Sequence, residues 1–166
     1  MAQQTRGYAH RVDIRADIDE VWKSLTEPER LARWCAQQAR VDAREGGSYW
    51  LRVDAGLTRE AHIDVFQPPR RLRLIYLPMP GLPGDEAVIV DDFLLHQEPA
   101  KDPKGRPQTS VRLLGSGVPE GPAWDALYLK LRSGWERALL RLKVSLEPSR
   151  PAAPKPGAAN PLAPKK

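Results

Sequence analysis

The apolar residues near the start of the chain change their spacing, and the change separates one strand from two helices. Within residues 8–14 the large apolar side chains, Tyr8, Val12 and Ile14, share one parity and the charged ones the other, which predicts a strand. After this strand the apolar residues recur at spacings of three and four, which predicts a helix. Asp17 is a candidate N-cap, and Glu20, three residues later, could complete a capping box. A second short helix is expected from Thr26, another candidate N-cap, to Trp34.

From Ala39 onward the pattern predicts six strands. Gly46-Gly47 separates the first two, and such a pair is typical of a tight hairpin turn. Pro68-Pro69 separates the next two, because two prolines cannot both lie inside a hydrogen-bonded ladder. The last two strands flank the polar segment 99–107. Strands joined by short turns indicate an antiparallel sheet.

A long helix is predicted at the end of this body, beginning near 122–124 and ending at Leu146. Its apolar residues recur at spacings of three and four, and basic and polar residues mostly occupy the other side. From Trp124 to Leu146 it would span about 34 Å at 1.5 Å per residue. Such a helix can cover one face of an antiparallel sheet, so we expect an α+β fold with its helices on one face.

Gly134 lies in the middle of this helix, next to Trp135. A glycine inside a helix costs about 1 kcal/mol relative to alanine, so its presence needs a reason. One hypothesis is that the helix lies over a hollow and that Gly134 leaves room for the sheet or for a ligand. The alternative is that Gly134 lets the helix approach a bulky core residue in a filled interior.

Composition narrows the class of protein. The chain has 166 residues, of which 41% are hydrophobic and 28% charged, as expected for one globular domain. Its net charge is +5, but residues 148–166 carry four basic residues and no acidic one, so 5 − 4 leaves +1 for the rest. We therefore expect no nucleic-acid partner. With no apolar run of 18 residues we also expect no membrane partner. Six prolines in residues 148–166 predict a disordered Pro/Ala/Lys-rich tail.

The residues that could carry metal or nucleophilic chemistry do not form a recognisable pattern. His10, His62 and His96 lack the spacing of metal ligands, so we expect no metal and no cofactor. Cys35 is the only cysteine, which excludes an internal disulfide and suits the cytoplasm. It follows Trp34, but nothing in the sequence pairs it with a histidine, and a small buried thiol is the commoner role. No catalytic residue is predicted.

Several segments come in the order of a known family: "DEVWKSLTEPERLARW", "VDAREGGSYW", "PPRRL", and "SG" before a terminal helix that contains "GW". Over residues 8–147 the chain resembles the START-like helix-grip superfamily (SRPBCC), most closely the group related to the C-terminal domain of the activator of heat-shock protein 90 ATPase. The resemblance implies a curved antiparallel sheet wrapped around the long C-terminal helix, with two short helices closing one end. In many members an apolar cavity for a lipid-like or polycyclic ligand lies between sheet and helix. Many relatives also have a histidine before the Ser-Gly pair, where this chain has Gly115.

The resemblance and the strand pattern together nominate the residues that would line such a cavity. These candidates are Trp34, Trp50, Tyr76, Asp92, Arg112, Trp124, Tyr128, Leu131 and Trp135. Asp91 and Asp92 interrupt an apolar strand and point to opposite faces unless a bulge or an edge exposes both. An inward aspartate and an inward Arg112 could anchor the polar end of an amphipathic ligand.

The sequence thus predicts a helix-grip domain over residues 1–147 and a tail over 148–166. Our first hypothesis is a cytoplasmic protein that binds a hydrophobic small molecule in the cavity and has no catalysis of its own. One alternative is a protein-interaction module of the co-chaperone type, which would have a protein partner. The other is a polyketide-cyclase-like enzyme. A cavity of about 300 Å³ or more favours the first or the last, and a filled core with an exposed apolar patch favours the interaction module.

Overall fold

The computed structural model describes residues 4–54, 57–78, 82–84, 86–100 and 104–147. The predicted tail, 148–166, lies outside the described residues. The elements in chain order are β1 (Thr5–Ile14), α1 (Ile18–Thr26), α2 (Pro28–Leu31), β2 (Gln38–Val41), β3 (Ser48–Asp54), β4 (Leu57–Gln67), β5 (Arg71–Tyr76), β6 (Val90–Glu98), β7 (Gln108–Pro119) and α3 (Pro122–Leu146).

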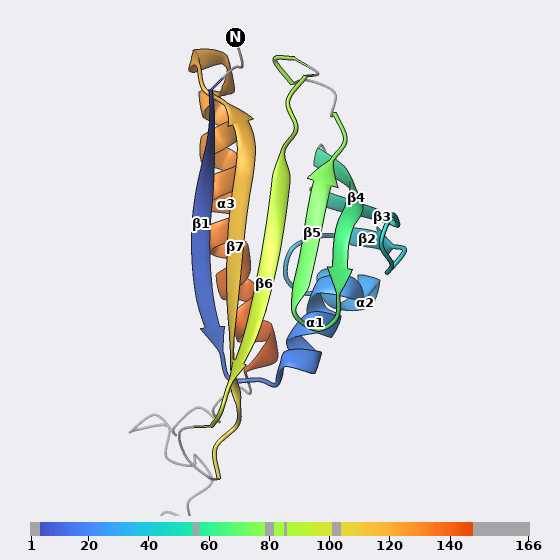
Figure 1. Ribbon diagram of the computed structural model, residues 1–166, viewed down its shortest axis with the longest axis vertical. Coiled ribbons are helices and arrows are strands. Elements are labelled where there is room, and N and C mark those ends of the chain that lie inside the picture. The colour runs from blue at the N-terminus through green and yellow to red at the C-terminus, as the bar shows by residue number, and fades with distance from the viewer. Residues whose placement is uncertain (1–3, 55–56, 79–81, 85, 101–103, 148–166) are drawn as a thin grey trace, which may run out of the picture.

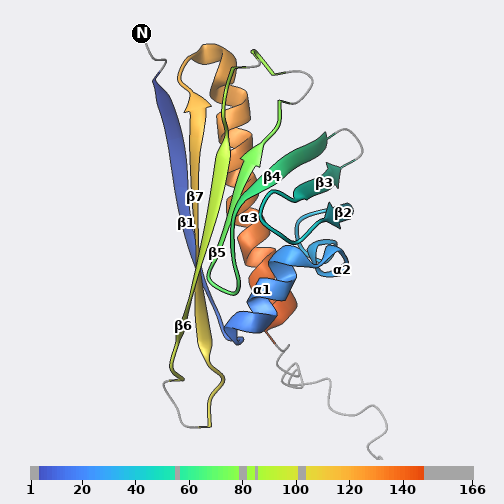
Figure 2. The same ribbon diagram turned by 45° about the vertical axis from the view of Figure 1, so that its right-hand side comes forward.

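The described strands form one seven-stranded sheet in the order β1-β7-β6-β5-β4-β3-β2. Every neighbouring pair is antiparallel, and β1 pairs with β7, so the first and last strands lie side by side. The sheet curves around α3, which lies along one face, and α1 and α2 lie together at its lower end (Figure 1 and Figure 2). The expected α+β helix-grip fold is confirmed. Within the described part of the chain, no helix has both the length and the apolarity needed to span a bilayer.

Of the two N-caps expected for the short helices, the one of α1 is confirmed and the one of α2 is wrong. The Glu20 backbone N–H donates to Oδ1 of Asp17 at 3.0 Å, so Asp17 is the predicted N-cap of α1. The Glu20 carboxylate accepts from Arg30 at 2.7 Å and the capping box is only half formed. Thr26 does not cap α2, because its hydroxyl donates to the Trp22 carbonyl at 2.9 Å and Pro28 starts the helix one residue later.

The core lies between the concave face of the sheet and the helices. Strands place alternate residues there, so Ile63, Phe93 and Leu113 are all buried. The long helix contributes a buried stripe at helical spacing that includes Leu131 and Leu142. Burying one such side chain stabilises the fold by about 1.5–3 kcal/mol. The core fixes α3 against the sheet and so positions the site described next.

Candidate functional site

A hollow of about 280 Å³ lies between α3 and strands β3 and β4. Its lining residues are Cys35, Leu51, Val53, Leu57, Arg59, Leu127, Lys130, Leu131, Gly134, Trp135, Arg137, Ala138 and Arg141. The volume is close to the lower end of small-molecule pockets, about 300 Å³. Most of these side chains are apolar, as such pockets usually are, and the polar ones are cationic.

Gly134 faces the empty part of this hollow. A Cβ atom placed on Gly134 would meet no heavy atom within 4 Å beyond the neighbouring backbone. This contradicts the close-approach hypothesis, in which glycine was needed for contact with a bulky core residue. The glycine instead leaves space open beside Trp135, which lines the same hollow.

Trp135 forms one wall and is held from several sides. Its ring meets Phe93 edge-on at 5.5 Å between centroids and Trp34 at 6.3 Å. Its Nε1–H donates to Oδ2 of Asp91 at 3.1 Å. These contacts restrict its rotamer, so the wall of the hollow is preorganised.

A buried polar cluster adjoins the same wall. Arg59 lines the hollow although only 5% of it is exposed. Its guanidinium lies 3.8 Å from the centroid of the Tyr76 ring, and its Nη1 is 3.7 Å from Oδ2 of Asp91. Asp91 is fully buried and also accepts a hydrogen bond from the Tyr8 hydroxyl. Strands β1, β4, β5 and β6 therefore each contribute one member of the cluster.

Burial sets the protonation of the groups around Arg59. It raises the pKa of Tyr76, which Arg59 only partly offsets, and it raises the pKa of Cys35. Both side chains are therefore neutral near pH 7, and the Cys35 thiol is a poor nucleophile. Burial alone would lower the pKa of Arg59, but the acidic groups around it, Asp91 among them, outweigh it, so Arg59 stays charged.

The candidate residues from the sequence divide into three groups, and the first surrounds the hollow. Leu131 and Trp135 line it directly. Trp34 and Tyr76 form a second layer, since Trp34 packs on Trp135 and Tyr76 lies beneath Arg59.

The second group lies towards the N-terminal end of α3 and does not line the hollow. Trp124 is buried in the core near that end. Tyr128 donates its hydroxyl hydrogen to the Gly7 carbonyl at 2.8 Å and lies under the guanidinium of Arg6. Tyr128 therefore links α3 to β1, and Trp124 belongs to the hydrophobic core.

The third group lies on the opposite face of the sheet, which corrects the nomination of Asp92 and Arg112. Asp92 accepts two hydrogen bonds from Arg71, at 2.8 and 3.1 Å, and Arg112 is exposed. The inward acid is Asp91, which shares the parity of Phe93. The inward arginine is Arg59, which the sequence reasoning missed.

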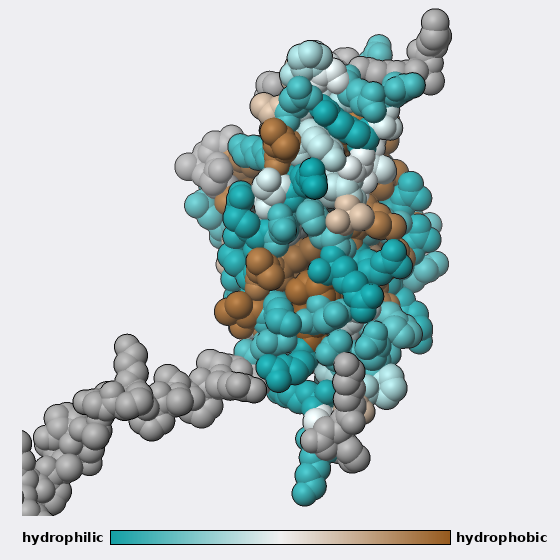
Figure 3. Space-filling view, turned by 90° about the vertical axis from the view of Figure 1, so that its left-hand side faces the viewer, coloured by the Kyte–Doolittle hydropathy of each residue, from teal (hydrophilic) through white to brown (hydrophobic). Residues whose placement is uncertain are grey.

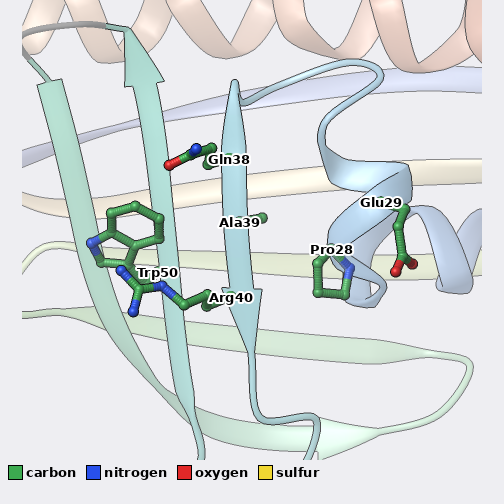
Figure 4. A pocket seen from close by; sticks show the side chains of 6 residues that line it. All are labelled: Pro28, Glu29, Gln38, Ala39, Arg40 and Trp50. Carbon is green, nitrogen blue, oxygen red and sulfur yellow. The ribbon is translucent and has the colours of Figure 1, made fainter.

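Trp50 belongs to the third group as well. Its ring stacks with the guanidinium of Arg40 at 4.3 Å, on the face away from α3. There it borders a separate surface pocket with Pro28 and Glu29 of α2, and Figure 4 shows the Arg40 side chain lying against the indole. Tyr49 takes the inward place instead and donates its hydroxyl hydrogen to the Leu25 carbonyl at 2.7 Å.

Few of the groups used in acid–base or metal catalysis lie in the lining of the hollow. Among the lining residues that the structure describes, none is a carboxylate or a histidine. Within the same described ranges, no three His, Cys, Asp or Glu residues are grouped so that they could hold a metal ion. Asp91 does not line the hollow, and both its oxygens already accept hydrogen bonds, from Tyr8 and Trp135.

Solved structures with the same fold include several proteins of low sequence identity. A protein from Mesorhizobium loti superposes with a TM-score of 0.68 at 19% identity, covering 84% of this chain and 95% of that one. The Aha1 dimer from Colwellia psychrerythraea also gives 0.68, at 21% identity over 86% and 96% of the two chains. An HSP90 activator from Plasmodium falciparum gives 0.66, at 13% identity over 84% and 95%. Identities this low show the fold alone.

The family model is more specific than these superpositions. A search of curated proteins found no match. The model described as Activator of Hsp90 ATPase homolog 1-like protein, however, matches residues 15–147. That range begins after β1 and runs through α3, so it includes every residue that lines the hollow. The chain therefore belongs to the family of Activator of Hsp90 ATPase homolog 1-like proteins.

Proposed function

We propose that this protein binds an apolar small molecule in the hollow beneath α3 and does not transform it. The observation that carries the proposal is Gly134, a glycine inside a helix that faces open space within an apolar wall. A side chain there would fill part of the hollow and improve the helix at once. Glycine at this position therefore lowers the stability of the helix, and the binding of a ligand in the open space would explain why no side chain fills it.

The energetics of an unfilled hollow support the same view. Protein interiors are normally packed to the density of organic crystals, and wall atoms without partners lose their dispersion contacts. An apolar ligand would restore those contacts for Leu131 and Trp135. Because Trp135 is already held by Phe93 and Trp34, the wall needs little ordering on binding.

An enzymatic role has weaker support. A general acid or base must come within hydrogen-bond distance of its substrate, and Asp91 does not line the hollow. Burial raises the pKa of Cys35, so the lining thiol stays protonated. A cyclase-like reaction would have to rely on groups other than these two.

Native mass spectrometry of the freshly purified full chain tests the proposal. We expect a stoichiometric adduct that leaves when the protein is denatured. Gly134→Leu should lose the adduct and remain folded, because the new side chain enters open space. Glu136→Leu, at a nearby exposed position of α3, is the matched control and should keep the adduct. An apo mass for the parent chain, with no uptake of added apolar compounds, would contradict the proposal.

A protein-interaction role is the second candidate, and a surface feature favours it. Leu129, Leu140 and Val144 of α3 are more than half exposed, and hydrophobic side chains gather in the middle of the face seen in Figure 3. Exposed apolar groups of this kind often mark docking surfaces. Measuring the ATPase rate of a heat-shock protein 90 with and without this chain tests the role. A stimulation that Gly134→Leu leaves intact but Leu140→Ser with Val144→Ser abolishes would separate it from ligand binding.

A further inference from the structure

We propose that the ligand is an amphipathic anion, an elongated apolar molecule with one carboxylate. The carboxylate binds between Arg59 of β4 and Arg141 of α3, and the apolar body lies along α3 beside Gly134. The inference rests on the proposed function, because it assigns a chemical class to the ligand of the same hollow.

The charged side chains that line the hollow are all cationic among the described residues. Its lining contains Arg59, Lys130, Arg137 and Arg141, and among the described lining residues none is Asp or Glu. Asp91 lies 3.7 Å from Nη1 of Arg59 and offsets part of this positive charge, although it does not itself line the hollow. A concave site lined by one sign of charge concentrates ligands of the opposite sign. A neutral hydrophobic ligand would gain nothing from these cations.

Arg59 has hydrogen-bonding capacity that the protein does not use. Its Nε–H is buried and has no hydrogen-bond partner among the residues that the structure describes. The 3.7 Å separation from Asp91 is longer than a hydrogen bond, and the oxygens of Asp91 are occupied by Tyr8 and Trp135. A buried guanidinium normally has its donors satisfied. A carboxylate is the group whose geometry matches a guanidinium in two parallel hydrogen bonds.

Arg141 approaches the same end of the hollow from the helix side. Its Nε–H donates to the Trp34 carbonyl at 2.8 Å, which fixes the side chain over that end. Cys35 lines the hollow together with both arginines. Burial raises the pKa of its thiol, and the charges of Arg141 and Arg59 both act against that increase. A carboxylate near Cys35 would therefore face a cation from each wall. The two arginines together can compensate both the carboxylate of the ligand and the nearby Asp91, whereas Arg59 alone could compensate only one of them.

The remainder of the hollow suits an extended apolar chain. The lining residues of α3 run from Leu127 to Arg141, a distance of about 20 Å along the helix. Between these ends the helix presents Leu131, Gly134 and Ala138, and the strands present Leu51 and Leu57. The cationic head site lies at one end of this apolar path, which orients the ligand.

Three probes of equal chain length test the ligand class on the full-length protein: sodium decanoate, decan-1-ol and decyltrimethylammonium. Binding is followed by tryptophan fluorescence, because Trp135 lines the hollow. Decanoate should bind roughly tenfold or more tightly than decan-1-ol, and the cation should bind most weakly; one charge-assisted interaction corresponds to about that factor. Equal affinity for decanoate and decan-1-ol would overturn the assignment of an anion while leaving the proposed function intact. Failure of all three probes to bind would overturn both.

Two variants locate the head group. Arg141→Gln should weaken decanoate binding about tenfold and leave decan-1-ol unchanged. Arg132→Gln is the matched control, since it removes one charge from an exposed position of α3 outside the lining, and it should change decanoate affinity less than about twofold. Equal losses in the two variants would show a general charge effect and contradict the head-group site.

The contribution of Arg59 needs a variant that keeps the fold. The double change Arg59→Gln with Asp91→Asn removes both buried charges together, so neither is left uncompensated. We expect it to fold, as checked by circular dichroism, and to bind decan-1-ol normally. Its preference for decanoate should fall to within about threefold. A preference unchanged from the parent chain would exclude Arg59 as the anchor.

Discussion

Two neighbouring aspartates on β6 form ion pairs with arginines on opposite faces of the sheet, and the pairs differ in almost every respect. Asp92 and Arg71 meet in two hydrogen bonds at 2.8 and 3.1 Å, with side chains 16% and 34% exposed. Asp91 and Arg59 are 0% and 6% exposed, and their closest approach is 3.7 Å. The well-bonded pair is on the wetter face, and the poorly bonded pair is in the core.

This difference means that the inner pair gives the fold little net stabilisation for two buried charges. Burying two charges is expensive, and only good geometry with further hydrogen bonds offsets the cost. Asp91 has those bonds, from Tyr8 and Trp135, but within the described part of the chain the Nε of Arg59 has none. The inner arginine is held in place by its ring and charge contacts while some of its bonding capacity remains unused. That combination supports the proposed binding role of the hollow.

The largest expected effect comes from removing the inner acid. Asp91→Ala should lower the free energy of unfolding by about 3–5 kcal/mol, because Arg59 becomes an uncompensated buried charge and the Tyr8 hydroxyl loses its acceptor. Urea denaturation of the variant and the parent chain measures it. The comparison between the two pairs fails if Asp92→Ala costs as much.

The next largest effect is a gain in stability, which we expect from replacing Gly134. Gly134→Ala should raise the free energy of unfolding by about 0.5–1 kcal/mol, because alanine favours the helix and its Cβ meets open space. Thermal and urea unfolding both report it. Destabilisation would mean that the helix is closer to the strands than the hollow implies.

The outer pair should contribute less. Asp92→Ala should lower the free energy of unfolding by about 0.2–1 kcal/mol, the usual range for partly exposed pairs, and the loss should shrink in high salt. A double-mutant cycle with Arg71→Ala isolates the coupling. A coupling that salt leaves unchanged would show that this pair behaves as a buried one.

The smallest effect is expected where α3 ends. Burial acts to raise the pKa of Glu147, but the hydrogen bonds from the Arg15 backbone N–H and from Lys143 outweigh it, so the pKa lies below the ordinary 4.5. A lowered carboxyl pKa stabilises the fold above the unfolded-state value and loses that contribution as the pH falls through the folded-state value. Glu147→Gln should therefore cost no more than about 0.5 kcal/mol at neutral pH.

Urea denaturation at a series of pH values tests whether folding lowers or raises the pKa of Glu147. The difference between parent and variant should be constant above about pH 5 and should shrink as the pH falls below 4.5. A difference that grows on acidification would reverse the assigned direction. Glu147 is the C-cap of α3 and is 15% exposed, close to the exposure of Asp92. It therefore extends the comparison of ion pairs to a helix terminus.

Much of the fold was predictable because it depends on local periodicity. The alternation on β1, the Asp17 cap and the 25-residue helix α3 were all indicated by the sequence. The inward position of Arg59 could also have been found, since it shares parity with Ala61 and Ile63 on β4. The arginine that the sequence nominated, Arg112, lies at an exposed position of β7 instead.

The sequence by itself determined the elements, most of their buried faces and the family, because periodicity and capping act between residues close together in the chain. Only the tertiary structure decided which inward residues meet. Arg59 and Asp91 lie on strands separated by β5, and Tyr8 reaches Asp91 from β1. Gly134 faces open space only because the curved sheet does not follow α3 closely there. Contacts of this kind depend on strand order and sheet curvature, which are set by the packing of the whole chain.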